Sequence, residues 1–211
     1  MTNPAQTAAS RRETMRAWLR LSGMLPVLVL LCIGFELASG RFLSVGNLSI
    51  VMQQASINAV LAAGMTFVIL TGGIDLSVGS ILALAAVVAV GATLTPGLAW
   101  AAIPLALLAG AACGLVNGSL IAWLGLPPFI VTLGALTAVR GVARLAAGDS
   151  TVFNSDLPFS VIGNGTLLGV PWLVVIAFLV ILLSWVILRR TVLGTWIYAV
   201  GGNAEAAAIG T

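Results

Sequence analysis

The run that decides the fold is PWLVVIAFLVILLSWVIL, which extends from Pro171 to Leu188 without a charged residue and is followed at once by Arg189 and Arg190. A helix of about 20 apolar residues is long enough to cross the roughly 30 Å hydrocarbon layer of a membrane. We therefore interpret this run as a transmembrane helix that ends in two positive charges at a membrane surface.

The composition of the whole chain agrees with this interpretation. Of the 211 residues, 60% are hydrophobic and only 7% are charged, and the mean hydropathy is +1.16. A soluble domain carries about 25% charged residues, and a disordered chain needs low hydrophobicity together with high charge. The composition excludes both classes and indicates an integral membrane protein whose main partner is the lipid bilayer.

Measured by the same length criterion, the chain is expected to be an all-α, polytopic transmembrane helix bundle. Its six predicted spans cover residues 21–37, 50–70, 78–94, 98–124, 129–146 and 171–188. Residues 1–20 form an N-terminal segment, residues 21–188 form the transmembrane domain, and residues 189–211 follow it. A cleaved signal peptide is the alternative for the first span, but the length of the apolar run and the spans that follow it favour an uncleaved helix.

Arginines predict the orientation of these spans. Four of them precede the first span, so the positive-inside rule places the N-terminus in the cytoplasm. Six crossings bring Arg189 and Arg190 to the same side, which agrees with the rule. The polar connection 148–169 then lies on the outer side of the membrane, opposite the cytoplasm.

The charged residues also exclude several kinds of chemistry. All nine basic residues are arginine, and the chain has neither lysine nor histidine. A phosphate-binding loop of the GxxxxGK type is therefore absent, as are Schiff-base, imidazole and histidine-ligated metal chemistry. Cys32 and Cys113 lie in separate apolar runs and form no metal pair. No catalytic residue, cofactor or metal site is expected on this chain, and the position of the arginines beside apolar spans argues against nucleic-acid binding.

A polar, glycine-containing stretch separates the second and third predicted spans, and reads TGGIDLSVG from Thr71 to Gly79. Gly72 and Gly73 permit backbone angles closed to other residues. One interpretation is a turn in which Asp75 or Ser77 accepts hydrogen bonds from free N–H groups of the next helix. The other is a broken helix whose polar backbone lines a translocation pathway, which a membrane tolerates only under cover of protein or water.

Two further groups of polar residues are candidates for a translocation pathway. Gln54 and Asn58 are four residues apart and share one helical face, where their amides suit the hydroxyls of a polyol. The alternative is interhelical hydrogen bonding.

Arg140 lies about 17 Å along a helix from Phe129, at a depth where an unpaired guanidinium is costly. It faces the pathway or pairs with Asp75, or else has a purely structural partner, while Arg144 is close enough to the outer interface to reach it.

Small residues recur every four positions in the fourth predicted span, at Ala106, Gly110, Gly114 and Gly118. Such a ridge lets a neighbouring helix approach closely, so we interpret it as a helix-packing surface.

The stretch after the last span has a different character. Gly201, Gly202 and Asn203 are expected to form a turn, and Asn203 can cap a short alanine-rich helix whose first turn contains Glu205. This helix is either a docking element for a cytoplasmic partner or a simple connection to another span.

Four motifs, in matching order, are similar to those of one family. They are GGIDLSVG at 72–79, PPFIVTLG at 127–134, Arg140-Gly141, and YAVGGNAEAA at 198–207. Together they resemble the membrane subunit of bacterial ABC importers for simple sugars, of the ribose-permease type.

The resemblance implies a dimeric permease in the cytoplasmic membrane that imports a monosaccharide such as ribose. Its implied partners are a separate ATPase subunit that holds the ATP, a periplasmic sugar-binding protein, and a second permease subunit. The family's coupling helix maps onto 201–210, with Glu205, Ala206 and Ala207 in its signature. Members of the family continue with further spans, so this chain is expected to be an N-terminal part of a permease. The alternatives are an ion-coupled carrier, which usually has more mid-membrane ionisable groups, and a fragment that does not transport.

Overall fold

The computed structural model describes residues 23–203 and 206–207. The predicted N-terminal segment 1–20 and Glu205 therefore lie outside the described residues. The chain divides into two compact units between Val51 and Met52, and each unit is described by itself.

The first unit contains helix α2, Leu25–Ser39, and the first turns of α3, Val45–Leu70. Gly40 ends α2 in the left-handed conformation, with φ of 62°, which glycine adopts without the steric cost that a side chain adds. Beyond it, the carboxylate of Glu36 accepts a hydrogen bond from the Leu43 N–H at 2.7 Å. The rings of Phe35 and Phe42 stack with their centroids 5.6 Å apart. These contacts hold the connection from α2 to α3.

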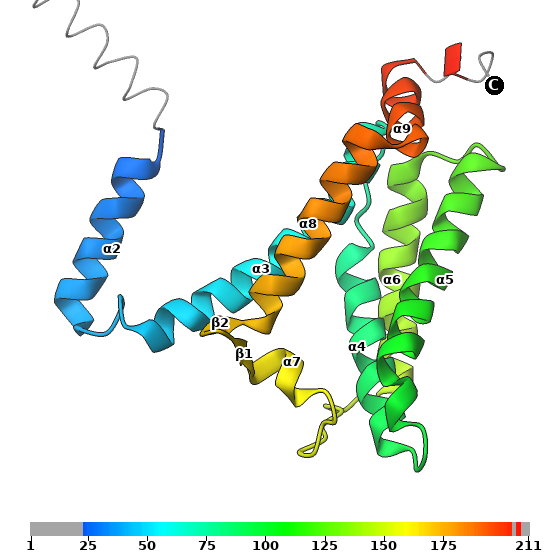
Figure 1. Ribbon diagram of the computed structural model, residues 1–211. Coiled ribbons are helices and arrows are strands. Elements are labelled where there is room, and N and C mark those ends of the chain that lie inside the picture. Colours follow the sequence, from blue (N-terminus) through cyan, green and yellow to red (C-terminus); the bar gives the residue numbers. More distant parts are fainter. Residues whose placement is uncertain (1–22, 204–205, 208–211) are drawn as a thin grey trace, which may run out of the picture. The chain divides into compact units, whose positions relative to one another are not determined.

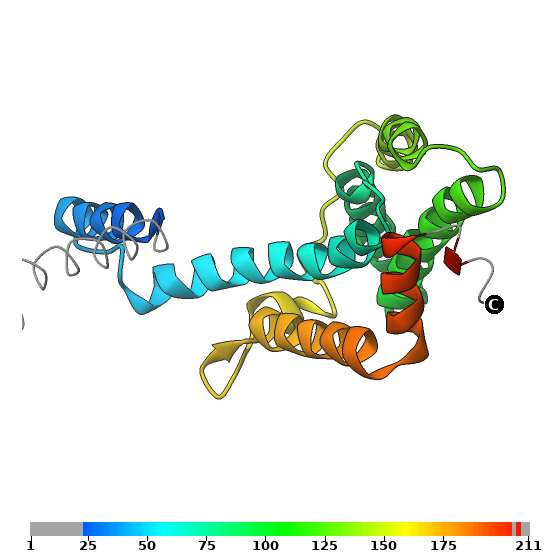
Figure 2. The ribbon, with the colours of Figure 1, turned by 90° about the horizontal axis from the view of Figure 1, so that it is seen from above.

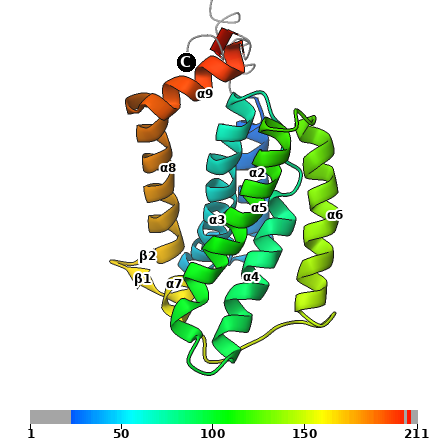
Figure 3. The same ribbon diagram turned by 90° about the vertical axis from the view of Figure 1, so that its right-hand side faces the viewer.

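The second unit begins within α3 and is built almost wholly of helices. Its further elements are α4 Val78–Leu94, η1 Ala99–Ala101, α5 Ala102–Ala122, α6 Pro128–Ala146, α7 Ser160–Asn164, β1 Thr166–Leu167, β2 Val170–Pro171, α8 Trp172–Arg190 and α9 Val192–Gly202. Figures 1 and 3 both show α4 lying side by side with α5 and α6, and these are its most extensive contacts with other elements. The antiparallel pair β1–β2 is the exception to the predicted all-α fold.

Proline sets the start of two helices. Pro128 stands in the first turn of α6, and Pro171 directly precedes α8. A proline at the start of a helix loses no hydrogen bond, because the first N–H groups have no partner within the helix. Both starts lie within one residue of the predicted ones.

Among the described residues, four helices are long and apolar enough to cross a membrane: Val45–Leu70, Ala99–Ala122, Pro128–Ala146 and Trp172–Arg190. The polytopic helical bundle that the sequence predicts is confirmed at this level, whereas the number of six spans is not. Helix α2 has 15 residues and α4 has 17, and at 1.5 Å per residue α4 is about 26 Å long. It falls short of the hydrocarbon thickness because the chain before it, from Thr71 to Ser77, is not helical.

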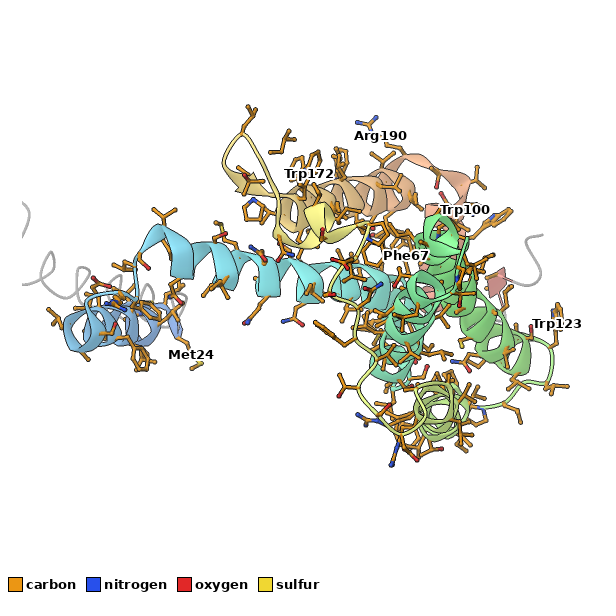
Figure 4. All side chains as sticks on the ribbon, turned by 90° about the horizontal axis from the view of Figure 1, so that it is seen from below. Met24, Phe67, Trp100, Trp123, Trp172 and Arg190 are labelled. Atoms are coloured by element: carbon orange, nitrogen blue, oxygen red, sulfur yellow. The ribbon has the colours of Figure 1, made fainter. Side chains whose placement is uncertain are left out.

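Two tryptophans flank α5 on the exposed surface. Trp100 is 80% exposed and Trp123 is 84% exposed, and Figure 4 shows both side chains projecting from the ribbon. They lie 23 positions apart, which corresponds to about 34 Å of helix. Tryptophan is enriched at both interfaces of a membrane, so this spacing is typical of a transmembrane helix.

The predicted small-residue ridge on α5 is covered over only part of its length. Gly110 faces α4, since a Cβ built there would lie 3.8 Å from Cγ2 of Ile81. At Gly114 and Gly118 a Cβ would meet no heavy atom of the described residues within 4 Å. Ala106 is half-buried like Gly110. Close packing along the whole ridge stays a prediction.

Candidate functional site

The candidate site is the non-helical segment Thr71–Ser77, which joins α3 to α4. Helix α3 ends in two backbone hydrogen bonds, from Gly72 N–H to Ile69 O at 2.9 Å and from Gly73 N–H to Val68 O at 3.0 Å. Gly72 has φ of 80°. This pattern is a Schellman motif, in which a left-handed glycine satisfies the last carbonyl groups of a helix. It explains why the helix stops at the predicted glycines.

Helix α4 starts at the other end of this segment through the carboxylate of Asp75. Its Oδ1 accepts hydrogen bonds from the Ser77 N–H at 2.7 Å and from the Ser77 hydroxyl at 2.6 Å. Asp75 therefore binds a backbone N–H group at the helix start, as one sequence interpretation expected. Ser77 differs from that expectation, because its side chain accepts no hydrogen bond from the helix N–H groups.

Ser77 is instead directed toward α5. It is fully buried, and its Oγ accepts a hydrogen bond from Nδ2 of Asn117 at 3.0 Å. Asn117 is itself only 7% exposed. Asp75, Ser77 and Asn117 thus form a chain of hydrogen bonds between the helix break and the C-terminal part of α5.

Thr132 of α6 binds the other side of the segment. Its hydroxyl lies 3.0 Å from the carbonyl oxygen of Ile74 and 2.8 Å from that of Pro128, and its one proton is shared between them. Gly73 is also close to this helix, since a Cβ there would lie 3.9 Å from Cβ of Pro128. The segment is therefore bound to α5 on one side and to α6 on the other.

The residues that bind the segment are set back from the neighbouring ends of α5 and α6. Asn117 is six residues before Trp123 and Thr132 is four residues after Pro128, which corresponds to about 9 Å and 6 Å of helix. Figure 1 shows the chain entering the start of α4 from the end of α3 as a coil between helices. Irregular backbone of this kind is tolerated at membrane depth only where protein or water covers it. Thr71, Gly72 and Ile74 are exposed, and the interpretation of the segment as a broken helix that lines a pathway stays a prediction.

The sequence interpretation missed both anchors, Asn117 and Thr132. The signal for Asn117 was present, because it is the one carboxamide in the fourth predicted span and lies one position from the small-residue ridge. Thr132 belongs to the motif PPFIVTLG. A lone polar residue in an apolar helix does not indicate which residue it will bind, however. The hydrogen-bond partner of each anchor is more than 35 residues away in the sequence.

Helix α9 contacts the end of α3, directly before this segment. A Cβ at Gly201 would clash with the carbonyl oxygen of Leu70, the last residue of α3, so these backbones are in direct contact. Figure 2 shows the C-terminal part of α9 beside the end of α3. Gly201 and Gly202 are the last residues of α9, and the prediction that they form a turn is wrong. Both glycines are helical. Because Gly201 has no side chain, the backbone of α9 can approach that of Leu70.

The break in the chain falls at Asn203, which has an extended backbone. Its Oδ1 accepts a hydrogen bond from the Ala206 N–H at 3.0 Å, and its carbonyl accepts one from the Ala207 N–H at 3.0 Å. This is the capping arrangement expected for Asn203. The position of Asn203, Ala206 and Ala207 after α9 agrees with a short helix there.

Gln54 and Asn58 are not brought to the break. Both side chains are exposed on α3, and neither forms a hydrogen bond with a described residue. Ser56, which is buried, lies on the face toward Ala177 of α8. The pathway role of the two amides is untested by these contacts.

Arg140 does not pair with Asp75 in this structure. It lies eight residues beyond Thr132, which is about 12 Å further along α6, and it lines a groove together with Ala83, Arg144 and Asp149. Nε of Arg144 forms an ion pair with Asp149 at 2.8 Å, in which the two side chains are 73% and 63% exposed. No group of three histidine, cysteine or acidic residues that could hold a metal occurs among the described residues.

A family comparison identifies the group to which this architecture belongs. The family described as "Branched-chain amino acid transport system / permease component" matches residues 47–210, which include the helix break, both anchors and α9. The chain belongs to this family. The family resemblance inferred from the four motifs is therefore confirmed.

Three curated relatives of this permease-family chain carry the names of sugar transporters. The ribose import permease protein of Escherichia coli (strain K12) is 42% identical over 206 residues, which cover 95% of this chain and 64% of the relative. The fructose import permease protein of Bifidobacterium longum is 41% identical over 166 residues, 76% of this chain and 46% of the relative. The D-allose transport system permease protein of E. coli is 35% identical over 182 residues, which cover 85% of this chain and 55% of the relative. No solved structure matches the chain.

Proposed function

We propose that this chain is part of the permease subunit of an ATP-driven importer, which moves a monosaccharide such as ribose across the cytoplasmic membrane. The observation that carries the proposal is the 42% identity to a ribose import permease protein over 95% of the chain. The chain spans 64% of the length of that relative. The family description names branched-chain amino acids, so the class of substrate is the first point to test.

The proposed topology has six spans with the N-terminus in the cytoplasm. Residues 1–20 and 189–211 lie on the cytoplasmic side, and residues 21–188 form the transmembrane domain. Helices α2 and α4 serve as spans although they are short, because a short apolar helix is accommodated by local thinning of the bilayer or by its neighbours. Arg189 and Arg190 close α8 at the cytoplasmic face, and Figure 4 shows the Arg190 side chain pointing away from the ribbon.

In this topology the helix break opens toward the cytoplasm. Gly72 and Gly73 let the backbone leave α3, and Asp75 and Ser77 place a carboxylate and a hydroxyl between α5 and α6. A half-buried carboxylate and nearby backbone carbonyl groups are suitable hydrogen-bond acceptors for sugar hydroxyls. Gln54, Asn58 and Arg140 are proposed to line other parts of the pathway.

The proposed coupling runs through α9. A separate ATPase subunit binds and hydrolyses ATP, and its closure displaces the segment 201–210, which includes Asn203, Glu205, Ala206 and Ala207. Gly201 transmits this displacement, because its backbone touches Leu70 at the start of the break. Alternating access then follows from movement of the break relative to α5 and α6. A periplasmic sugar-binding protein and a second permease subunit complete the proposed assembly.

The proposal is tested by uptake into cells that lack their own ribose permease. A complete permease that carries this sequence is expressed with its ATPase and binding protein, and uptake of labelled D-ribose is measured with and without excess unlabelled D-ribose or L-leucine. Uptake of labelled D-fructose, D-allose and L-leucine is measured in parallel. We expect ribose uptake that unlabelled ribose abolishes and leucine leaves unchanged. Uptake of leucine without uptake of any sugar would overturn the sugar assignment.

The energy source is tested in the same cells. We expect depletion of ATP to stop uptake while a protonophore, added with ATP maintained, leaves most of it. The reverse result would indicate an ion-coupled carrier, which is the main alternative. Purification of the assembled complex with intact-mass analysis identifies the partners, and recovery of the permease without an ATPase would contradict the importer.

A further inference from the structure

The connection between α6 and α8 ends in an arm that carries no charge. Residues 157–171 contain no aspartate, glutamate, lysine, arginine or histidine. Residues 160–171, which we call the hairpin arm, form α7 and the antiparallel pair β1–β2, in which Leu167 pairs with Val170. The arm contains ordinary turn residues such as glycine, proline and asparagine, but it has no charged side chain.

The largest exposed side chains of the hairpin arm are apolar, and they lie beside the smaller exposed polar residues Ser160, Asn164 and Thr166. Leu168 is 97% exposed at the tip of the hairpin, and Val161 is 63% exposed on α7. Leu167 and Val170, at the base of the turn, are 41% and 42% exposed. The arm therefore presents aliphatic surface that nothing in the described part of the chain covers.

The turn at the tip of the hairpin places a leucine in a backbone conformation that leucine rarely adopts. Leu168 and Gly169 both have positive φ, of 52° and 84°. A two-residue hairpin turn of this kind favours asparagine followed by glycine, since leucine rarely adopts positive φ. The leucine at this position costs conformational energy, which directs attention to a role for its side chain.

The hairpin arm is fixed to the first residue of α8. The Trp172 N–H donates a hydrogen bond to the Gly165 carbonyl at 3.1 Å, and a Cβ at Gly165 would lie 3.2 Å from Cδ1 of Trp172. Figures 1 and 3 show β1 and β2 running sideways from the start of α8. The arm extends across the end of the helix and does not continue its axis.

The two ends of α8 have the residues typical of a helix that spans a membrane. Helix α8 is one of the four helices long and apolar enough to span, and it begins with a tryptophan and ends with two arginines, both typical of interfaces. An uncharged arm that leaves this end sideways therefore lies in the interfacial plane. Apolar side chains gain free energy there by leaving water.

We propose that the hairpin arm binds the lipid surface, with Leu167 and Leu168 inserted at the boundary between headgroups and acyl chains beside α8. The partner is the bilayer itself, and the interaction holds the outer end of α8 at a fixed depth. This proposal depends on membrane insertion of α8 and not on the transported substrate.

The test measures the environment of the tip directly. In a chain with Cys32 and Cys113 replaced by alanine, Leu168→Cys is labelled with a nitroxide and reconstituted into vesicles of phosphatidylcholine and phosphatidylglycerol. Collision rates with oxygen, which enters lipid, and with a water-soluble nickel chelate are compared by power-saturation EPR. The control is Asp156→Cys, in the same connection but before the uncharged stretch.

We expect the label at Leu168 to favour oxygen several-fold over the nickel chelate, and the label at Asp156 to show the reverse. Equal access of the nickel chelate to both sites would overturn the proposal. Protection of Leu168 from both reagents would overturn it as well, because that result indicates burial against protein.

A second variant keeps the test independent of folding at the tip. Leu168→Asn places the preferred residue in the turn and removes the apolar side chain. With the label moved to Leu167→Cys, we expect the Leu168→Asn change to lower oxygen access at least two-fold. Unchanged oxygen access would mean that Leu168 does not hold the arm in lipid.

Discussion

The backbone of Gly201, near the end of α9, touches the carbonyl group of Leu70, at the end of α3. The two residues are separated by most of the second unit in sequence, yet no side chain lies between them. The contact joins the helix after the last span to the segment that carries Asp75 and Ser77. It places α9 next to the residues that precede the buried hydrogen-bond chain.

Gly201→Ala is expected to disturb this contact. A Cβ has no room beside Leu70, and overpacking of this kind costs about 1–3 kcal/mol. We expect uptake to fall well below half while ATP hydrolysis by the assembled complex continues. Gly202→Ala is the matched control, because a Cβ there meets nothing within 4 Å among the described residues. Equal effects of the two variants would contradict a transmitting role for Gly201.

Substitution of Asp75 separates the role of its charge from the role of its hydrogen bonds. Asp75→Asn keeps an oxygen that can accept from Ser77 but removes the carboxylate charge, whereas Asp75→Ala removes both. We expect Asp75→Asn to insert into the membrane at the normal level and to transport sugar poorly. Normal uptake by Asp75→Asn, together with loss of protein in Asp75→Ala, would leave Asp75 with only the role of starting α4.

The bond between Asn117 and Ser77 is tested by a double-mutant cycle on protein stability in detergent. Asn117→Leu leaves the buried Ser77 hydroxyl without a donor, and we expect it to lower the free energy of unfolding by about 1 kcal/mol. Ser77→Ala removes the other partner. The coupling energy is expected near 0.6 kcal/mol, typical of hydrogen bonds between membrane helices. Additive effects would show that the bond contributes nothing.

The two arginines of α6 are expected to differ in effect. The Arg144–Asp149 pair is 73% and 63% exposed, so Arg144→Ala is expected to change the free energy of unfolding by less than about 1 kcal/mol and to leave uptake nearly unchanged. Arg140 forms no ion pair with a described residue. Arg140→Ala is expected to reduce uptake several-fold, and a normal rate would remove it from the proposed pathway.

Glu205→Arg addresses the proposed ATPase contact. We expect the variant to assemble with its partners, to hydrolyse ATP, and to lose coupled sugar uptake, because the charge at the proposed docking helix is reversed. Coupled uptake at the normal rate by Glu205→Arg would exclude Glu205 from the coupling contact.

Local sequence patterns were sufficient to predict the long apolar helices and the place of the break, but not α7, α9 or the β1–β2 pair. Apolar runs gave helix bounds within a few residues, as at Val78–Leu94, since the length and apolarity of a run are local properties. Gly72 and Gly73 located the end of α3, and Asp75 was a correct candidate for the start of α4. These features depend on neighbours in the chain, and so the sequence alone determined them.

Tertiary structure alone decided which residues complete the site. Asn117 and Thr132 bind the break from helices that are distant in sequence, and the helical Gly201 depends on the approach of α9 to Leu70. A hydrogen bond between distant residues is set by how helices pack, and composition carries no information on that packing. The sequence by itself therefore determined a membrane protein of the permease family whose chain leaves helical geometry between α3 and α4, and the packing of α5, α6 and α9 decided how that segment is held.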